Sequence, residues 1–283
     1  MIKKTSSINI SPLRYPGGKS RAVNILKKYI PLNTKEICSP FLGGASFELS
    51  CAKEGLRVYG YDIFEPLIDF WQCLLDDKNS LVREVKKYYP LKKTAFYKLQ
   101  SNHINLKTKI ERAAGFFVLN RSSFSGSTLS GGMSPGHPRF TESSIERLLS
   151  FSIKNFTVEK ADFEESISKH KETLLYLDPP YLIKSALYGR KGDAHKYFNH
   201  KGLFEILRNR NKWILSYNNC PEIIDMYKDY AIEYPIWKYG MSNDKSSREI
   251  LILSPDIADK NKSKTKIECQ IKQETEKRLN MLY

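Results

Sequence analysis

An acid, two prolines and an aromatic residue follow a short apolar run in the second half of the chain. Residues 174–177 have strand length, and Asp178-Pro179-Pro180-Tyr181 comes directly after them. The prolines end the strand and lack a backbone N–H, which leaves the Asp178 carboxylate and the Pro179 carbonyl as two acceptors at the carboxyl end of a buried strand. Two acceptors suit a planar –NH2 group, and the Tyr181 ring offers a stacking surface for a base. The stretch predicts a site for an exocyclic amine, although an ordinary strand-ending turn has the same composition.

A second set of residues has the order of a mononucleotide-binding unit. Residues 36–41 are a strand candidate, a glycine turn at 42–46 leads into a helix, and a second strand over 57–62 ends in Asp62. In such a unit the turn lets a ligand approach the backbone, and the acid accepts hydrogen bonds from both ribose hydroxyls. The spacing therefore predicts a nucleoside-containing cofactor near Gly43 and Asp62.

The loop before the first helix holds a third candidate. Residues 11–20 are bounded by prolines and glycines, and residues 21–29 have helical spacing. Backbone N–H groups at that helix start, together with Lys19, would hold a carboxylate or a phosphate. The loop lacks the Gly-x4-Gly-Lys-Ser spacing of a phosphate loop, and a helix-capping turn would also explain it.

Composition favours a nucleic-acid partner. The chain has 283 residues, with 46 basic against 31 acidic side chains and a net charge of +15. A charge of this size attracts polyanions, although excess lysine can also serve solubility. The five cysteines are odd in number and far apart, so neither a disulfide framework nor a metal site is expected. No secretory signal and no apolar run of membrane-spanning length are found, so we expect a cytoplasmic protein without a membrane partner.

The pattern changes between residues 81 and 150. Lysine- and tyrosine-rich segments precede a helix expected over 108–121, and residues 120–140 are polar, glycine-rich and aromatic. Arginines in this stretch are placed to reach phosphates or guanine edges, so we expect a DNA-reading insertion, the alternative being a surface loop. The expected DNA contacts are Asn120, Arg121, Phe124, Ser125 and Arg139.

Further strands are expected after this stretch. Candidates lie at residues 156–163 and 212–218, and two late runs at 231–237 and 248–254 suggest an antiparallel hairpin. The sequence therefore predicts an α/β fold with a mostly parallel sheet and an antiparallel edge. Its expected parts are a catalytic domain formed by residues 1–80 and 151–258, the insertion at 81–150 and a charged tail at 259–283.

Four motifs in this order resemble the Dam-like (D12 class, alpha-group) adenine-N6 DNA methyltransferases. They are Arg-Tyr-Pro-Gly-Gly-Lys at 14–19, Pro-Phe-x-Gly-Gly-x-Ser at 40–46, Asp62 and the Asp178 motif, and the resemblance covers nearly the whole chain up to Pro255. It implies a Rossmann-like seven-stranded sheet with a mainly helical inserted recognition domain. It also implies S-adenosylmethionine as methyl donor, double-stranded DNA as partner and, functionally, a cognate restriction endonuclease.

The resemblance also implies roles for individual residues. Asp178, Pro179 and Tyr181 match the catalytic motif. The residues that would contact the cofactor are Tyr15, Lys19, Phe41, Gly43, Asp62, Asp162, Phe163 and Asp178. Asp162 has a second interpretation as a turn residue at a strand end.

The implied chemistry is direct methyl transfer. An adenine inside a duplex is out of reach, so it must be flipped out and held by stacking on Tyr181 and by hydrogen bonds to its edge. Asp178 and the Pro179 carbonyl would favour the pyramidal, nucleophilic amine and the positive charge that it develops. This transfer requires neither a cysteine nucleophile nor a metal.

One stretch of the expected recognition insertion departs from the pattern of family members that methylate GATC. Enzymes that methylate GATC carry a guanine-reading arginine three residues after the glycine of the Asn-Arg-x-x-Tyr-Asn-Gly stretch, whereas here Gly126 is followed by Ser127, Thr128 and Leu129. Phe124 and Ser125 replace the Tyr-Asn pair. The GATC target is therefore not expected, and Arg139 is the candidate for guanine reading.

Other functions compete with this interpretation. The nearest alternatives are cytosine-N4 DNA methylation, whose enzymes usually carry Ser at the position of Asp178, and RNA adenine methylation. A catalytically silent DNA-binding regulator would not need Asp178, Lys19 and Asp62 together. A nicotinamide dehydrogenase would share the glycine turn without requiring the Asp178 motif or the strong positive charge.

Overall fold

The structure of the protein is a computed structural model. It describes residues 11–15, 17–134, 139–182, 198–236 and 249–260. The side chain of Ser125 is also outside the description. Most of the predicted tail at 259–283 and of the segment joining the last two strands therefore lies outside the described residues. No helix among the described ones has the length and apolar character needed to cross a bilayer.

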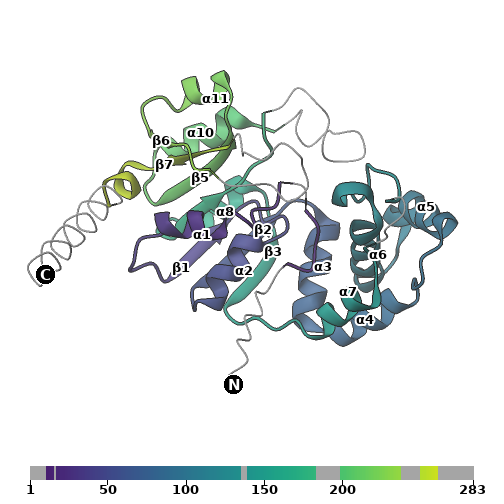
Figure 1. The fold of residues 1–283 in the computed structure, drawn as a ribbon. Helices are drawn as coiled ribbons and strands as arrows, with labels where there is room; N and C mark the ends of the chain where they lie inside the picture. The colour runs from purple at the N-terminus through teal and green to yellow at the C-terminus, as the bar shows by residue number, and fades with distance from the viewer. Residues whose placement is uncertain (1–10, 16, 135–138, 183–197, 237–248, 261–283) are drawn as a thin grey trace, which may run out of the picture.

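Seven strands form one sheet (Figure 1). They are β1 (Glu36–Ser39), β2 (Arg57–Asp62), β3 (Phe156–Lys160), β4 (Leu174–Leu177), β5 (Trp213–Asn218), β6 (Ala231–Glu233) and β7 (Glu249–Leu253). Their order is β3-β2-β1-β4-β5-β7-β6, with parallel neighbours from β3 to β5, while β7 runs antiparallel to β5 and β6. The predicted mostly parallel sheet with an antiparallel edge is confirmed.

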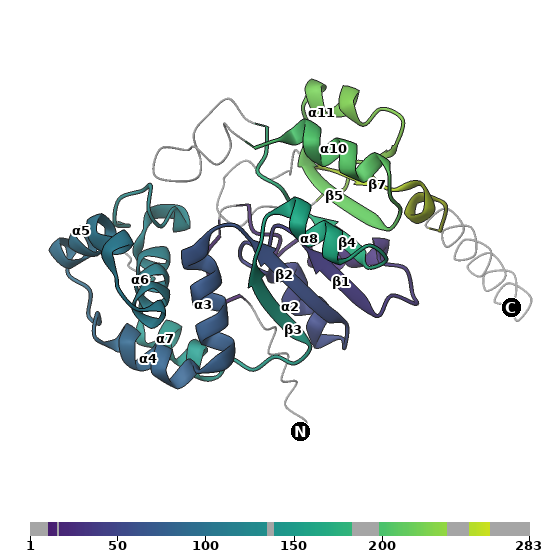
Figure 2. The ribbon, with the colours of Figure 1, turned by 180° about the vertical axis from the view of Figure 1, so that it is seen from behind.

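Helices cover both faces of the sheet, as the opposite views in Figures 1 and 2 show. Successive side chains of a strand point to opposite faces, so Leu174 and Tyr176 of β4 enter one apolar cluster while Leu175 and Leu177 enter the other. The first cluster includes residues of α1 (Val23–Leu26), α2 (Ser46–Lys53) and α3 (Glu65–Asp76). The second includes residues of α8 (Phe163–Lys169), α10 (His200–Arg208) and α11 (Pro221–Met226). Continuous apolar strands are what a doubly covered parallel sheet requires.

The predicted insertion is mainly helical. The helical lobe consists of α4 (Lys78–Lys86), α5 (Lys93–Asn102), α6 (Lys109–Ser122) and α7 (Glu142–Leu149), with short 3-10 turns η2 (His103–Asn105) and η3 (Phe124–Gly126); another 3-10 turn, η1 (Lys27–Tyr29), follows α1. Thr108 begins α6 with a capping box, since its hydroxyl accepts from the Glu111 N–H and the Glu111 carboxylate accepts from the Thr108 N–H.

Helix α3 joins the helical lobe to the sheet. It contacts β2 and β3 on one side and α6 on the other, and Figure 1 shows the lobe beyond α3. The rings of Phe70 on α3 and Phe117 on α6 stack with 5.6 Å between their centroids and 5° between their planes. The lobe thus shares the apolar cluster of one sheet face, which holds it in a defined position beside the sheet.

Candidate active site

The sheet order creates a switch point between β1 and β4. These strands are neighbours, but the chain leaves β1 toward β2 on one side and leaves β4 toward β5 on the other. The loops after the two strands therefore diverge, and open α/β sheets bind their ligands in the crevice that results. The glycine turn follows β1 and Asp178 follows β4, so the first two sequence-predicted sites meet at this edge.

Lys19 binds directly to Asp178. Its ammonium donates to the two carboxylate oxygens at 2.8 and 2.7 Å, to the Tyr181 hydroxyl at 2.8 Å and to the Gly17 carbonyl at 3.1 Å. The Lys19 side chain is 4% exposed and that of Asp178 is 23% exposed, so the ion pair is shielded on the lysine side and open on the carboxylate side. The carboxylate that the sequence expected Lys19 to hold is, in this structure, Asp178.

Tyr181 is held by both its ring and its hydroxyl. Besides accepting from Lys19, the hydroxyl donates to Asp178 Oδ1 at 3.2 Å, and the ring lies 6.0 Å from that of Tyr217. The next residue is fixed by Asn218 at the end of β5, whose amide oxygen accepts from the Leu182 N–H and whose nitrogen donates to the Leu182 carbonyl. These bonds pre-organise the segment that carries Asp178 and the prolines.

Two buried glutamates lie near this ion pair, and sequence reasoning missed both. Glu249 is the first residue of β7, and because β7 runs antiparallel, its start lies at the edge where β4 and β5 end. Its Oε2 lies 3.5 Å from Lys19 Nζ and accepts from the Ser216 hydroxyl at 3.4 Å. Glu48 lies in the first turn of α2, and its Oε1 accepts from the buried Ser39 hydroxyl at 2.7 Å. The sequence signal that could have identified them is a single acidic residue in an otherwise apolar segment, since such a residue is rarely buried without a partner.

Both glutamates have raised pKa values. Burial raises the pKa of Glu48 to about 7, and the nearby charge of Asp178 adds to the rise while the Ser39 hydroxyl opposes it. Burial also raises the pKa of Glu249 to about 7, with Lys19 opposing and Asp178 adding to the rise. A carboxyl group that titrates near neutral pH beside a catalytic candidate is a feature of functional sites.

The glycine turn packs against Tyr15. Gly43 has a φ of +48°, and a Cβ built on it would lie 3.1 Å from the Tyr15 ring. A Cβ on Gly44 would lie 2.8 Å from the Tyr15 side chain. A side chain at either position would therefore displace the ring, and the glycines let the N-terminal loop lie directly on the turn.

The Asp62 carboxylate binds the backbone of the same glycine turn. Its Oδ2 accepts from the Gly43 N–H at 3.2 Å and its Oδ1 from the Phe64 N–H at 3.0 Å. Burial raises the pKa of this carboxyl, and the backbone N–H groups around it oppose the rise. Each oxygen accepts one of these bonds and has a second lone pair, which is what a ribose diol needs. The predicted cofactor residues therefore fit a nucleoside.

Three phenylalanine rings lie beside the turn. Phe41 follows β1, Phe163 begins α8 and Phe198 precedes α10. The Phe41 ring is 6.0 Å from that of Phe163 and 5.5 Å from that of Phe198, and the Phe163 and Phe198 rings are 5.4 Å apart. Phe198 was not identified from the sequence, where it lies in no recognisable motif. Such a cluster provides apolar surface for a planar base.

Asp162 caps a helix. Its carboxylate accepts from the Glu165 N–H at 2.8 Å and so begins α8, while the side chain is exposed. This is the second interpretation of Asp162, and it also explains why β3 ends at Lys160 rather than at the predicted residue 163. One observed task of Asp162 is thus structural.

Asn120 is a structural residue, contrary to its predicted role as a DNA contact. The side chain is fully buried, accepts from the Arg14 N–H and donates to the Arg14 carbonyl, both at 2.8 Å. It also donates to the Thr128 hydroxyl at 3.2 Å. These bonds fasten the end of α6 to the N-terminal loop that carries Tyr15 and Lys19, so no part of the amide is available to a nucleic acid.

Arg121 lies among other arginines. It donates to the Arg139 carbonyl at 3.1 Å and to the Pro12 carbonyl at 3.5 Å. Burial and the positive charges of Arg147, Arg14 and Arg139 lower its pKa to about 10. These four arginines come from four segments of the chain, and a bound anion would reduce the electrostatic repulsion between them.

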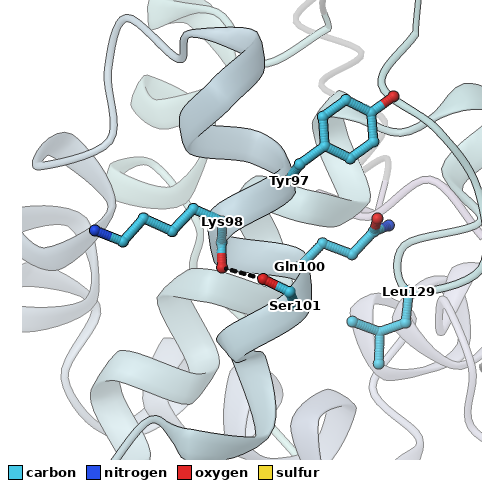
Figure 3. A pocket seen from close by; sticks show the side chains of 5 residues that line it. All are labelled: Tyr97, Lys98, Gln100, Ser101 and Leu129. Atoms are coloured by element: carbon cyan, nitrogen blue, oxygen red, sulfur yellow. Dashed lines mark hydrogen bonds between the residues drawn. The ribbon is translucent and has the colours of Figure 1, made fainter.

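The loop after α6 exposes Phe124 and Arg139. Phe124 is 62% exposed, an unusual state for a large apolar ring. The loop behind it is held by Gln100, whose amide donates to the Thr128 and Gly131 carbonyls. A depression between α5 and this loop is lined by Tyr97, Lys98, Gln100 and Ser101 of the helix and by Leu129 of the loop (Figure 3). That depression belongs to the helical lobe and not to the Asp178 site.

The described residues contain no group of three or more His, Cys, Asp or Glu side chains arranged to hold a metal ion. The four described cysteines, Cys38, Cys51, Cys73 and Cys220, are free thiols. Burial raises the pKa values of all four, which keeps them protonated and poorly nucleophilic at neutral pH.

Comparison with known proteins gives a family match. The model of the D12 class N6 adenine-specific DNA methyltransferase family matches residues 15–241. A DNA N-6-adenine-methyltransferase of Escherichia phage P1 is 26% identical over 253 residues, which cover 81% of this chain and 32% of the relative. The type II methyltransferase M.CviBI of Paramecium bursaria Chlorella virus NC1A is 20% identical over 178 residues, which cover 60% of this chain and 68% of the relative. The chain thus spans about a third of the phage protein's length.

Proposed function

We propose that this chain, which belongs to the D12 class N6 adenine-specific DNA methyltransferase family, methylates the exocyclic amine of adenine in double-stranded DNA. The observation that supports this most directly is the position of Asp178. It follows β4 at the switch point of the sheet, its carboxylate is partly open, and its lysine and tyrosine partners hold it from one side. An acceptor fixed in this way suits an amine that arrives from the open side.

The residues around the glycine turn fit S-adenosylmethionine. Asp62 would accept hydrogen bonds from the ribose hydroxyls, and Phe41 and Phe163 would contact the adenine ring. Tyr15 and Gly43 would lie along the cofactor at the turn, and Lys19 would join them from the N-terminal loop. When bound, this group supplies a methyl on a positively charged sulfur.

The protein's own part in the reaction is to hold the amine. Flipping an adenine from a duplex costs a few kcal/mol, and stacking on Tyr181 would offset part of that cost. The Asp178 carboxylate and the Pro179 carbonyl would each accept one N–H, which turns the nitrogen lone pair toward the methyl group. S-adenosylmethionine would supply the methyl group to the nitrogen held in this way, and the Asp178 carboxylate, which would already accept one of its N–H groups, would take up the proton that the methylated amine loses.

The helical lobe would bind the DNA. Arg121 and Arg139 lie in a positively charged group that also contains Arg14 and Arg147, and Phe124 projects from the same loop. Phosphate groups would relieve the repulsion between these arginines, and an exposed ring could enter the base stack. Ser125 stays a predicted contact on the strength of its place between Phe124 and Gly126.

We place this activity in a restriction-modification or epigenetic role. The chlorella-virus relative is a type II methyltransferase by name, which supports the first of these. A cognate restriction endonuclease would then be a functional partner that cuts the same target when it is unmethylated.

A labelling experiment tests the proposal. The purified protein is incubated with labelled S-adenosylmethionine and with duplex DNA or RNA of random sequence, and the modified nucleosides are separated. We expect label in N6-methyladenine from DNA only. Label in N4-methylcytosine, or in RNA, would replace the proposed substrate, and DNA binding without any transfer would indicate a regulator. Sequencing of DNA from a methylation-free host that expresses the protein would give the target.

A further inference from the structure

The ammonium of Lys19 faces more acceptors than it can satisfy. It lies within 3.1 Å of the Gly17 carbonyl, the Tyr181 hydroxyl and both Asp178 oxygens, and 3.5 Å from Glu249 Oε2. An ammonium has three protons, so at least five oxygens compete for them. Lys19 is also nearly fully buried, so water does not make up the difference.

This competition matters for Asp178. In the structure both Asp178 oxygens accept from Lys19, and Oδ1 also accepts from Tyr181. An adenine amine would need an Asp178 oxygen with a free lone pair and its full negative character. Among the described residues, Oδ2 accepts only from Lys19 and has a second lone pair for the amine, but the ammonium at 2.7 Å reduces its negative character until Lys19 shifts away.

Glu249 is the acceptor to which Lys19 can turn. Its Oε2 is already within ion-pair distance of Nζ, while its Oε1 is buried without a hydrogen-bond donor among the described residues. A buried carboxylate oxygen without a donor is costly, so a small movement of the ammonium toward Glu249 has a favourable destination. Ser216 holds Oε2 in place through its hydroxyl.

The net charge of the site also favours the reaction when Glu249 is ionised. Lys19, Asp178 and Glu249 together carry a net charge of −1 when Glu249 is ionised and zero when it is protonated. The reacting pair carries one positive charge, which begins on the sulfonium and spreads to the amine nitrogen in the transition state. In a site of low dielectric, a net negative surrounding favours that charge.

We infer that Glu249 is a positioning residue that acts through Lys19: in its ionised form it draws the ammonium away from Asp178 and leaves that carboxylate to the adenine amine. This inference rests on the proposed methyl transfer. It assigns a function to a residue that lies 71 positions beyond Asp178 in the sequence and outside the four motifs.

The neighbours of Glu249 decide how it titrates. Lys19, Asp178, Tyr181 and Ser216 face it directly, while Tyr176 and Glu48 lie in the same buried region. Its pKa of about 7 means that it is protonated below neutral pH and ionised above it. The rate of methyl transfer should therefore rise with pH across the neutral range, because only the ionised form releases Asp178.

Glu48 provides a matched control. It is equally buried and its pKa is also raised to about 7, but its Oε1 is held by the Ser39 hydroxyl, and it lies on α2 rather than beside Lys19. Replacing either glutamate by glutamine removes one titrating group of similar pKa and keeps the side-chain volume. A difference between the two variants therefore reports position and not merely burial.

The experiment measures single-turnover methylation of duplex DNA between about pH 5.5 and 8.5, with saturating S-adenosylmethionine. We expect the wild-type rate to rise about tenfold or more through neutral pH. A tenfold rise corresponds to a lowering of the activation free energy by about 1.4 kcal/mol when Glu249 is ionised. Glu249→Gln should lose this rise and stay at the wild-type level of low pH, while Glu48→Gln should keep it. The KM for DNA, measured separately under steady-state conditions, should change less than twofold in Glu249→Gln, because the residue is buried.

Two further variants keep the test decisive if Glu249→Gln fails to fold. Ser216→Ala removes a hydrogen bond to the ionised carboxylate and should move the rise to higher pH. Glu249→Asp keeps the charge and should restore part of the rise. A rise that persists unchanged in Glu249→Gln, or that stays in place in Ser216→Ala, would overturn the inference while leaving the proposed function intact. Absence of methylation by the wild-type protein would instead refute the proposed function.

Discussion

Lys19 donates to both carboxylate oxygens of Asp178, at 2.8 and 2.7 Å, across 159 positions of the chain. This ion pair joins the N-terminal loop to the end of β4, so the loop lines one side of the site. The same loop is fastened to the helical lobe through Arg14 and Asn120 and packs Tyr15 on the glycine turn. Three parts of the predicted machinery therefore meet through one short segment.

Asp178→Ala should abolish methyl transfer without unfolding the protein. The residue follows β4 and its carboxylate is partly exposed, so removing it disturbs little of the apolar core. Loss of the acceptor and of the negative charge beside the amine should lower the single-turnover rate by about 10³-fold or more.

Asp178→Asn is the matched control for this change, since it keeps the shape and one acceptor oxygen but loses the charge. It should be nearly as inactive while its circular dichroism and DNA affinity stay close to those of the wild type. Near-normal turnover in either variant would remove Asp178 from the catalytic role.

Asp62→Ala should weaken cofactor binding. Its carboxylate would accept hydrogen bonds from two ribose hydroxyls, and a charged acceptor of this kind contributes about 1.5–3 kcal/mol. Titration calorimetry with S-adenosylmethionine measures the loss. Because Asp62 also accepts from the Gly43 and Phe64 N–H groups, Asp62→Asn serves as the variant that keeps part of the turn intact. Unchanged affinity in both would refute the ribose assignment.

Arg139→Ala should relax one position of the target sequence. An arginine that is bidentate to guanine contributes about 1–3 kcal/mol of discrimination at a single base pair, whereas a phosphate contact contributes affinity that does not depend on sequence. The measurement is the methylation rate over all single-base variants of the mapped target, at two salt concentrations.

Arg147→Ala is the comparison for Arg139, since both arginines lie within electrostatic reach of Arg121. It should lower the rates on all targets together and reduce their dependence on salt. If Arg139→Ala behaves in the same way, Arg139 contacts phosphate and does not read guanine.

Phe124→Ala should impair methylation at every target. The ring is 62% exposed on the loop after α6, where it can support an opened base stack without contacting any one base edge. Fluorescence of 2-aminopurine at the target adenine measures flipping directly and should fall in this variant. Tyr97→Ala, which removes another exposed ring of the lobe, is the control and should have the smaller effect. A change of sequence preference in Phe124→Ala would contradict a purely supporting role.

Glu48→Gln should stabilise the protein at high pH. The pKa of Glu48 is raised in the folded state from 4.5 to about 7, so the folded protein binds a proton that the unfolded chain has already lost. That contribution to stability is fully present below about pH 4.5 and is lost as pH rises through about 7. Glutamine has no such loss, so the variant should gain at most about 3 kcal/mol at pH 8 relative to the wild type.

Thermal unfolding of wild type and Glu48→Gln across this pH range measures the difference. The two Tm values should converge toward about pH 4.5 and separate above it. A constant difference at all pH values would mean that Glu48 does not titrate in the folded protein. The Ser39 hydroxyl can still donate to the glutamine oxygen, so the variant keeps that hydrogen bond.

Features of the fold that depend on local pattern could be predicted from the amino-acid sequence. Apolar runs of strand length became β4, β5 and β7, and the strand, glycine turn, strand and acid from 36 to 62 became β1, the turn, β2 and Asp62 in contact with Gly43. Helix α6, expected over 108–121, spans Lys109–Ser122. These features follow from side-chain periodicity and turn chemistry within about twenty residues, which a single sequence displays directly.

Which residues from distant parts of the chain share the site could not be predicted in this way, because it depends on how the strands and helices assemble. The strand order places β7 antiparallel beside β5, and this brings Glu249 to Lys19. The same packing buries Asn120, a residue expected to contact the DNA. Periodicity shows which face of an element is apolar but not which element covers that face, so contacts over a hundred or more positions are set by the assembled core.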